Sequence, residues 1–347
     1  SGLERFEIEL DRSGDEGAIQ DNAADADEGL DQAMPAELSA VPWTVEFKFP
    51  VDNVEALETG LEWVEKSAPF LLGTCEHLGS ITIEHSSGTT RIWKISGEST
   101  REVGSEHIHE RKVQCSHQGD MLEQRVLRIA SKGDCRSRLV VVLAKRGGAW
   151  QLVPPGPGEP IVFARLPVRN SGFLRVACVV DGRFDVQEER DRIAMSDSDK
   201  EQLATALHAL PSAVSIGVSE GWHHPHQLAR VGKITSAFSE NTSEPELTWW
   251  NSCLADVAHR LAELQLVETA QGFRQAKRSK DGVHADFVVP RHSLTASNDE
   301  LPLEGIWLLG SQTTFLSVPT SVLASEWNDL SEGWAELGVP VARWGLA

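Results

Sequence analysis

The sequence predicts an α+β fold, in which a domain with a largely antiparallel sheet and helices is followed by a mainly helical domain. Three observations predict it. Short segments in which apolar and polar residues alternate recur between residues 80 and 144, with turn residues between them. Beyond residue 196, apolar residues recur mostly at helical intervals. A length of 347 residues also exceeds one ordinary compact domain, so two or three modules are expected.

Residues 1–40 are expected to form a short strand followed by an acidic, disordered linker. Within residues 3–10, the apolar side chains Phe6, Ile8 and Leu10 alternate with charged ones, as in a half-exposed strand. Residues 1–40 contain twelve acidic and two basic residues, which accounts for half of the net charge of −20. A segment this acidic and poor in aromatic residues tends to remain solvated.

Charge and cysteine usage exclude several classes of function. A net charge of −20 without a large basic block disfavours nucleic-acid binding, because the phosphate backbone would be repelled. Five widely spaced cysteines without a C-x-x-C pair predict neither a disulfide framework nor a zinc cluster. Cys178 and Cys253 fall in apolar stretches and are expected to be reduced thiols in the core. No signal peptide and no apolar run of eighteen residues is present, so we expect a cytoplasmic protein without a membrane partner.

The domain expected over residues 41–195 begins with an alternating strand at Trp43–Pro50. Capping-box spacing and apolar residues at helical intervals then predict a helix over about residues 53–66. Alternation and turn residues predict five strands, at Ser80–Glu84, Thr90–Ser96, Glu106–Ser116, Leu122–Ala130 and Arg138–Ala144.

Two further apolar runs, Ile161–Leu166 and Phe173–Val180, flank turn residues at 170–172 and predict a hairpin. The dipeptide Asp181-Gly182, typical of tight hairpin turns, follows the second run.

The domain expected over residues 196–347 is mainly helical. A short helix is predicted to begin near Ser198 and to end at Pro211. A stripe of apolar residues predicts a long helix over residues 247–264, and a second stripe over residues 323–337 ends at Gly338, where a C-cap glycine belongs. Short strands are expected around residues 287–289 and 306–309, and we find no internal repeat.

Residues 217–221 match the nucleophile-elbow pattern G-x-S-x-G and follow an apolar stretch at residues 213–218. This pattern favours an esterase-type serine hydrolase in which Ser219 is the nucleophile and a downstream histidine is the base. An ordinary turn is the alternative, because Pro225 falls where the helix after the elbow should run. Both interpretations stay open from the sequence.

Histidines cluster next to this pattern, at positions 223, 224 and 226. His224 and His226 could offer imidazoles to zinc or nickel, but no nearby carboxylate or cysteine completes a ligand set. The same holds for His107 and His109 on one face of a predicted strand. The sequence therefore predicts a surface loop and no metal site.

Several segments together resemble the region that follows the ATPase module in sacsin-like, heat-shock-protein-90-like GHKL ATPases. These are the strand WTVEFKFP at 43–50, the passage LPVRNSGFLRVACVVDGRFDVQEERDRI at 166–193, and Trp250-Asn251-x-x-Leu254 in the long helix. The resemblance implies an α+β middle domain whose nucleotide-binding lobe lies outside this chain. Residues 21–26 are similar to the Asn-box of these ATPases, but the adenine-binding turn and the phosphate lid that must accompany it are missing from the sequence.

The resemblance also implies a role for Arg190. In this family a basic residue of the middle domain reaches the γ-phosphate of ATP, and Arg190 is the matching position. The alternative is that Arg190 pairs with its acidic neighbours Glu188, Glu189 and Asp191. The resemblance implies ATP and magnesium for the parent protein, and no cofactor is expected in this chain.

The expected function is therefore that of a transducer and interaction region of a larger sacsin-like ATPase, chaperone-like or defence-related, without ATPase activity of its own. Its expected partners are the upstream ATPase lobe and other proteins or further copies of itself. Two alternatives stay open: the hydrolase that uses Ser219, and a scaffold whose tryptophan-bearing helices bind partner proteins.

Overall fold

In the computed structural model, all described residues except Val54 belong to one compact unit, residues 55–347. The described ranges are 54–84, 88–133, 136–156, 158–187, 191–235, 243–269, 272–275, 289–290, 324–339 and 343–344. The strands predicted at 3–10, 43–50 and 306–309, together with the acidic linker, lie outside these residues.

Five consecutive antiparallel strands form most of the main sheet, and this confirms the predicted fold class. They are β1 (Ser80–Glu84), β2 (Thr90–Val103), β3 (Glu106–His117), β4 (Asp120–Ser131) and β5 (Ser137–Arg146). All five strands predicted from alternation are present, and each pairs with its neighbour in sequence. Strand β2 is longer than predicted, and its second half pairs with β3 from Glu106 onward.

The sheet continues beyond β5 with segments that the sequence analysis assigned to a hairpin. They are β7 (Val162–Ala164), β8 (Leu166–Pro167), the 3-10 turn η1 (Arg169–Ser171) and β9 (Val179–Gly182), while β6 (Ala149–Leu152) pairs with β5. The predicted hairpin is wrong, because β9 pairs antiparallel with β5 and β7 then pairs parallel with β9. Asp181 and Gly182 accordingly lie within a strand, not in a turn.

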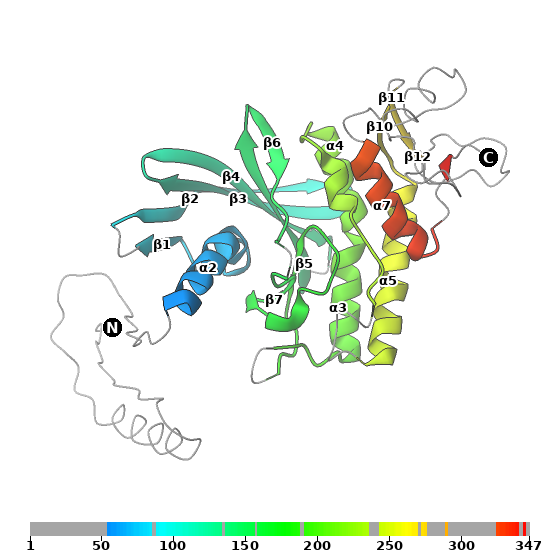
Figure 1. Ribbon diagram of the computed structural model, residues 1–347, viewed down its shortest axis with the longest axis horizontal. Helices are drawn as coiled ribbons and strands as arrows, with labels where there is room; N and C mark the ends of the chain where they lie inside the picture. Colours follow the sequence, from blue (N-terminus) through cyan, green and yellow to red (C-terminus); the bar gives the residue numbers. More distant parts are fainter. Residues whose placement is uncertain are drawn as a thin grey trace, which may run out of the picture. The chain divides into compact units, whose positions relative to one another are not determined.

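The two faces of β5 point into two different hydrophobic clusters. Val140 and Val142 face helix α2 (Val54–Thr74), whereas Leu139, Val141 and Leu143 face the opposite side. Helices α3 (Asp197–His208), α4 (Leu210–Ser219) and α5 (Glu244–Ala262) contribute to the cluster on that opposite side. Figure 1 shows α2 on one side of β5 and the helices α3 and α5 on the other. Burial on both faces explains why β5 reads as a continuous apolar run.

Helix α2 is longer than the predicted 53–66 and continues through Pro69 to Thr74. A proline inside a helix costs about 3 kcal/mol. Burial of Ala68, Phe70 and Leu72 against the sheet offsets this cost, because each side chain is at most 3 % exposed. The helix predicted over residues 53–66 is therefore too short, because apolar spacing within the segment does not reveal this contact with the sheet.

The helices after residue 196 follow the predicted pattern with shifted ends. Ser196 and Asp199 form the capping box that begins α3, two residues before the predicted Ser198. Pro211 does not end a helix but lies in the first turn of α4, where a missing backbone N–H costs little. The chain continues with the 3-10 turn η2 (Pro225–Ala229), α5, and the last described helix, α7 (Ala324–Glu336).

Short strand pairs complete the described residues. They are β10 (Gln265–Thr269) with β11 (Gly272–Gln275), and β12 (Val289–Pro290) with β13 (Arg343–Trp344).

One hydrophobic cluster spans the boundary expected between residues 195 and 196. It joins Leu143 of the sheet and Leu174 of the 165–178 connection to Leu203 of α3, Leu254 of α5 and Trp334 of α7. The sheet and these helices therefore share apolar contacts. Cys178 and Cys253 are buried in the same cluster as free thiols. Within the described ranges, no helix combines the length and the apolar composition needed to cross a bilayer.

Candidate functional site

Two histidines and a glutamate from distant parts of the chain meet beside η2. His224 directly precedes η2 in a left-handed backbone conformation (φ 56°, ψ 51°), and Pro225 then begins the turn. This geometry brings His226 into the interior, where it is 3 % exposed. Glu326 comes from the first turn of α7. One ligand atom from each of the three side chains lies within 4.8 Å of the other two.

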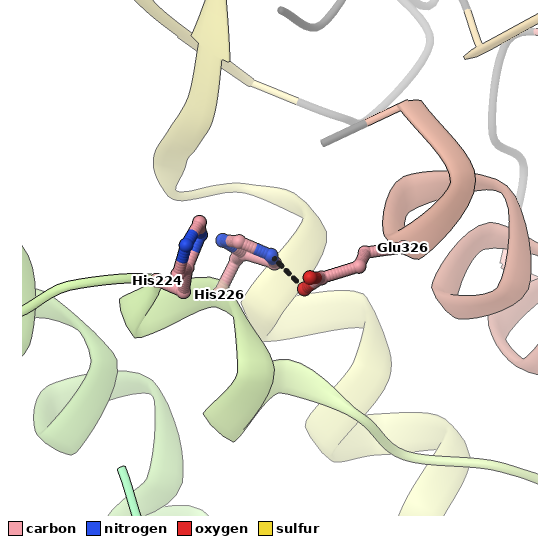
Figure 2. Close-up of side chains that lie close together, drawn as sticks. All are labelled: His224, His226 and Glu326. Carbon is pink, nitrogen blue, oxygen red and sulfur yellow. Dashed lines mark hydrogen bonds and ion pairs between the residues drawn. The ribbon is translucent and has the colours of Figure 1, made fainter. Parts of the chain in front are cut away.

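Direct hydrogen bonds hold the carboxylate of Glu326. The Nε2 atom of His226 lies 2.7 Å from Oε2 of Glu326, and Gln227 donates its Nε2 to the same oxygen at 3.2 Å. Figure 2 shows Glu326 extending from α7 to His226, with the ring of His224 beside that of His226. Each imidazole therefore has a ring nitrogen within 4.8 Å of a carboxylate oxygen of Glu326.

Packing of α7 positions Glu326. The indole of Trp327 stacks on the His226 ring at a centroid distance of 5.3 Å. The Nε1 atom of Trp334 donates to the carbonyl of Ala229 at 3.0 Å, and both indoles are buried. A Cβ atom at Gly333 would lie 2.9 Å from the carbonyl oxygen of Val231, so α7 packs there backbone against backbone. The glutamate is therefore held on a well-anchored helix.

The protonation states in this cluster suit metal binding. Burial lowers the pKa of His226, although its hydrogen bond to Glu326 opposes this shift. Burial would raise the pKa of Glu326, but hydrogen bonds from His226 and Gln227 outweigh it, so the pKa lies below its ordinary value. At neutral pH the ring is neutral and the carboxylate is ionised, and these are the forms that coordinate metals.

The sequence analysis missed this cluster because the carboxylate is 100 residues away from His226 along the chain. Nothing in the local sequence around Glu326 marks it as a ligand. The expectation that no carboxylate completes a set with His224 and His226 is therefore corrected. His107 and His109, by contrast, do not belong to the cluster, and His109 Nδ1 accepts a hydrogen bond from Arg128 Nε at 2.9 Å.

Ser219 does not lie in a nucleophile elbow. It is the last residue of α4, and its Oγ donates to the carbonyl of Ile216 at 2.9 Å. An elbow requires a strand before the serine and a helix after it, whereas here the apolar stretch before the serine is itself helical. The apolar stretch was ambiguous because a short buried helix and a buried strand have the same composition.

Arg190 lies outside the described residues, which end at Gln187 and resume at Asp191. Val186 and Ile193 form an antiparallel bridge, and Gln187 N donates to Arg192 O at 3.1 Å. Asn170 N donates to Asp191 O at 2.9 Å. The two ends of the segment that contains Arg190 are therefore tied to each other and to η1.

A network of buried arginines, which the sequence analysis did not anticipate, lies at the end of α2. Arg138 Nε is 2.8 Å from Asp181 Oδ2, and Arg165 N donates to Oδ1 of the same carboxylate. Burial and the neighbouring Arg138 and Arg111 lower the pKa of Arg128 to about 10. Glu76 lies 3.3 Å from Arg138 and 3.6 Å from Arg128. The arginines of this network pair with carboxylates of the same chain, which indicates a structural role.

Comparison of the chain with protein-family models, with curated proteins and with solved structures finds no match. The resemblance to sacsin-like ATPases is neither supported nor contradicted by this result. It stays a prediction that rests on the residues quoted above.

Proposed function

We propose that this chain is the transducer and interaction region of a larger sacsin-like GHKL ATPase, chaperone-like or defence-related. In this proposal Arg190 reaches an ATP and magnesium site on a lobe outside the chain. The observation that carries the proposal is that the two ends of the segment around Arg190 are hydrogen-bonded to each other. These two ends form the base of the segment. A residue that acts on a separate lobe must project from a base that its own domain holds in place.

Contacts on both sides of this base support the proposal. Ala194 N donates to Asp185 O at 2.8 Å, and Asp185 N donates to Oδ1 of Asp199 at 3.0 Å. Asp199 also belongs to the capping box that begins α3. Because α3 packs against β5 and β9, a displacement at the base would be transmitted to the sheet. That coupling is what a transducer requires.

The chemistry of arginine suits the proposed role. Its planar guanidinium pairs with two phosphate oxygens at once and offsets the charge that develops during phosphoryl transfer. The neighbouring acids Glu188, Glu189 and Asp191 are the competing partners. For Arg190 to reach the phosphate, docking of the ATP lobe must outcompete any pairing with these acids.

The two alternatives gain less from the structure. The hydrolase reading requires an elbow at Ser219, and helix α4 occupies that place. The scaffold hypothesis requires tryptophans at the surface, whereas Trp250, Trp327 and Trp334 are each at most 2 % exposed. Among the described helices, the partly exposed Trp63 of α2 and Trp249 of α5 are the tryptophans that a partner protein could contact.

The test uses the protein in which this chain is joined to its ATPase lobe. Replacing Arg190→Ala should lower kcat for ATP hydrolysis by about 10³-fold, the usual contribution of an arginine at a transferring phosphate. Arg183→Ala is the matched control, because Arg183 is exposed and lies in the same resembling passage. Equal turnover in the two variants would reduce Arg190 to a surface residue. The chain by itself should not hydrolyse ATP.

A further inference from the structure

We propose that His224, His226 and Glu326 form a binding site for a divalent transition-metal ion, with Zn²⁺ as the best-fitting ion. Two imidazoles and one carboxylate are a nitrogen and oxygen ligand set that zinc accepts readily. The site is built from residues at η2 and in α7 and shares none with the segment that contains Arg190. It therefore does not depend on the proposed ATPase function.

The geometry needs only small movements to accept an ion. Zinc lies about 2.0–2.1 Å from nitrogen and oxygen ligands, so the ligand atoms of a tetrahedral site are about 3.3 Å apart. His226 Nε2 and Glu326 Oε2 are 2.7 Å apart and must separate slightly. The ligand atom of His224 starts within 4.8 Å of both and must approach. On binding, the ion replaces the proton on His226 Nε2, and the neutral ring carries its proton on Nδ1 instead.

The surroundings hold the ligands in place before an ion binds. Gln227 donates to Glu326, Trp327 stacks on the His226 ring, and Trp334 ties α7 to Ala229. Such outer contacts orient metal ligands and raise affinity. His226 is buried while His224 and Glu326 are partly exposed, so an ion can reach the site from solvent.

The three side chains leave the fourth tetrahedral position for a water molecule or a ligand from another molecule. An ion at this site would also join α7 to η2, segments whose ligands are 100 residues apart in sequence. Because the ion binds only the folded arrangement, it should raise the thermal stability of the protein. The alternative is that His226 and Glu326 form only a hydrogen-bonded clamp, and the experiment distinguishes the two.

The experiment measures Zn²⁺ binding to the full chain, without a histidine tag and after removal of metals with EDTA. Competition with a chromogenic chelator should give one ion per chain, and Co²⁺ should show the visible absorption of a tetrahedral site. Glu326→Gln keeps an oxygen that accepts the hydrogen bond from His226, but the neutral amide is a poor metal ligand. This variant and His224→Ala should each weaken Zn²⁺ binding by about 100-fold or more, since changes outside the ligand set alone cost 10- to 100-fold.

His77→Ala is the matched control, because His77 is exposed and lies outside the cluster. It should bind Zn²⁺ like the unmodified chain. Circular dichroism and melting in EDTA should be alike for all variants. If Glu326→Gln does not fold, the partly exposed His224→Ala decides the question. Zn²⁺ binding that is absent, that is unchanged in both ligand variants, or that falls equally in His77→Ala would overturn the proposal.

Discussion

Buried charged side chains carry structural roles in this protein, and Arg111 is the clearest case. Its guanidinium donates to the carbonyls of Leu72, Cys75 and Glu76 at the end of α2. Its Nε also lies 2.9 Å from Oε1 of Glu98. The last carbonyls of a helix lack partners within the helix, so this arginine of β3 supplies the donors that α2 needs.

We expect Arg111→Met to lower the free energy of unfolding by about 2–4 kcal/mol. The substitution removes a donor from three carbonyls, of which that of Cys75 still accepts from Leu78 N, and it removes one ion partner of Glu98. Urea denaturation followed by tryptophan fluorescence measures the change. Lys112→Met is the control, because Lys112 is the next residue of β3 and is exposed. A loss no larger than in this control would contradict the capping role.

At the scale of an element, helix α2 depends on its contact with the sheet over its second half. A Cβ atom at Gly73 would lie 2.5 Å from Cγ1 of Val126 and 2.8 Å from Cγ1 of Val140. The helix approaches β4 and β5 this closely only because position 73 has no side chain. At Gly60, in the exposed first half of the same helix, an added Cβ meets no atom within 4 Å.

Replacement by alanine should therefore change the stability of the protein in opposite directions at these two positions. Gly73→Ala should destabilise the protein by about 1–3 kcal/mol, because the helix or both valines must move. Gly60→Ala should stabilise it by about 0.5–1 kcal/mol through helix propensity alone. Thermal or urea denaturation of both variants provides the measurement. If both variants changed the free energy of unfolding in the same direction, the residues around Gly73 would be able to move and make room for the added methyl group.

At the scale of the whole unit, imidazoles held between elements link stability to pH. His109 of β3 lies against Arg128 of β4, and His208 of α3 lies 2.9 Å from Asp256 of α5. Burial and Arg128 lower the pKa of His109, and burial and Arg260 lower that of His208, from an ordinary value of 6.5. Both rings stay neutral in the folded state at a pH where they are protonated in the unfolded chain.

We therefore expect the free energy of unfolding to fall as the pH decreases below about 6.5, because the unfolded chain then binds more protons than the folded one. His109→Gln should show a weaker decline between pH 7 and 5.5. Urea denaturation in EDTA across this range measures it, and the lower limit avoids titration of the carboxylates. An identical slope in the variant would exclude His109 as a contributor.

Local patterns were enough to predict most of the sheet. Alternation between turn residues placed β1 correctly and located the four strands that follow it, because each pairs with its neighbour in sequence. Gly338 was likewise predicted beyond the end of the last helix, and it has the positive φ of 84° expected of a glycine C-cap. Apolar spacing alone also located α3, α5 and α7.

Patterns that depend on distant partners were misread. The runs around residues 161–182 have the composition of a hairpin, yet β9 joins the free edge of β5 and β7 pairs parallel with β9. The nucleophile elbow at Ser219 was inferred from a five-residue pattern. The apolar stretch before Ser219 is a helix instead, because it is buried in the cluster that α5 and the sheet also form.

The sequence by itself determined the α+β class, the antiparallel order of β1 to β5 and the apolar faces of the later helices. These depend on periodicity and turns within about ten to fifteen residues. Only the tertiary structure decided that Glu326 meets His226, that Arg111 caps α2, and that Gly73 lies against two valines. Such contacts arise when apolar faces bury each other and bring remote segments together, and no local pattern records which polar side chains will then be neighbours.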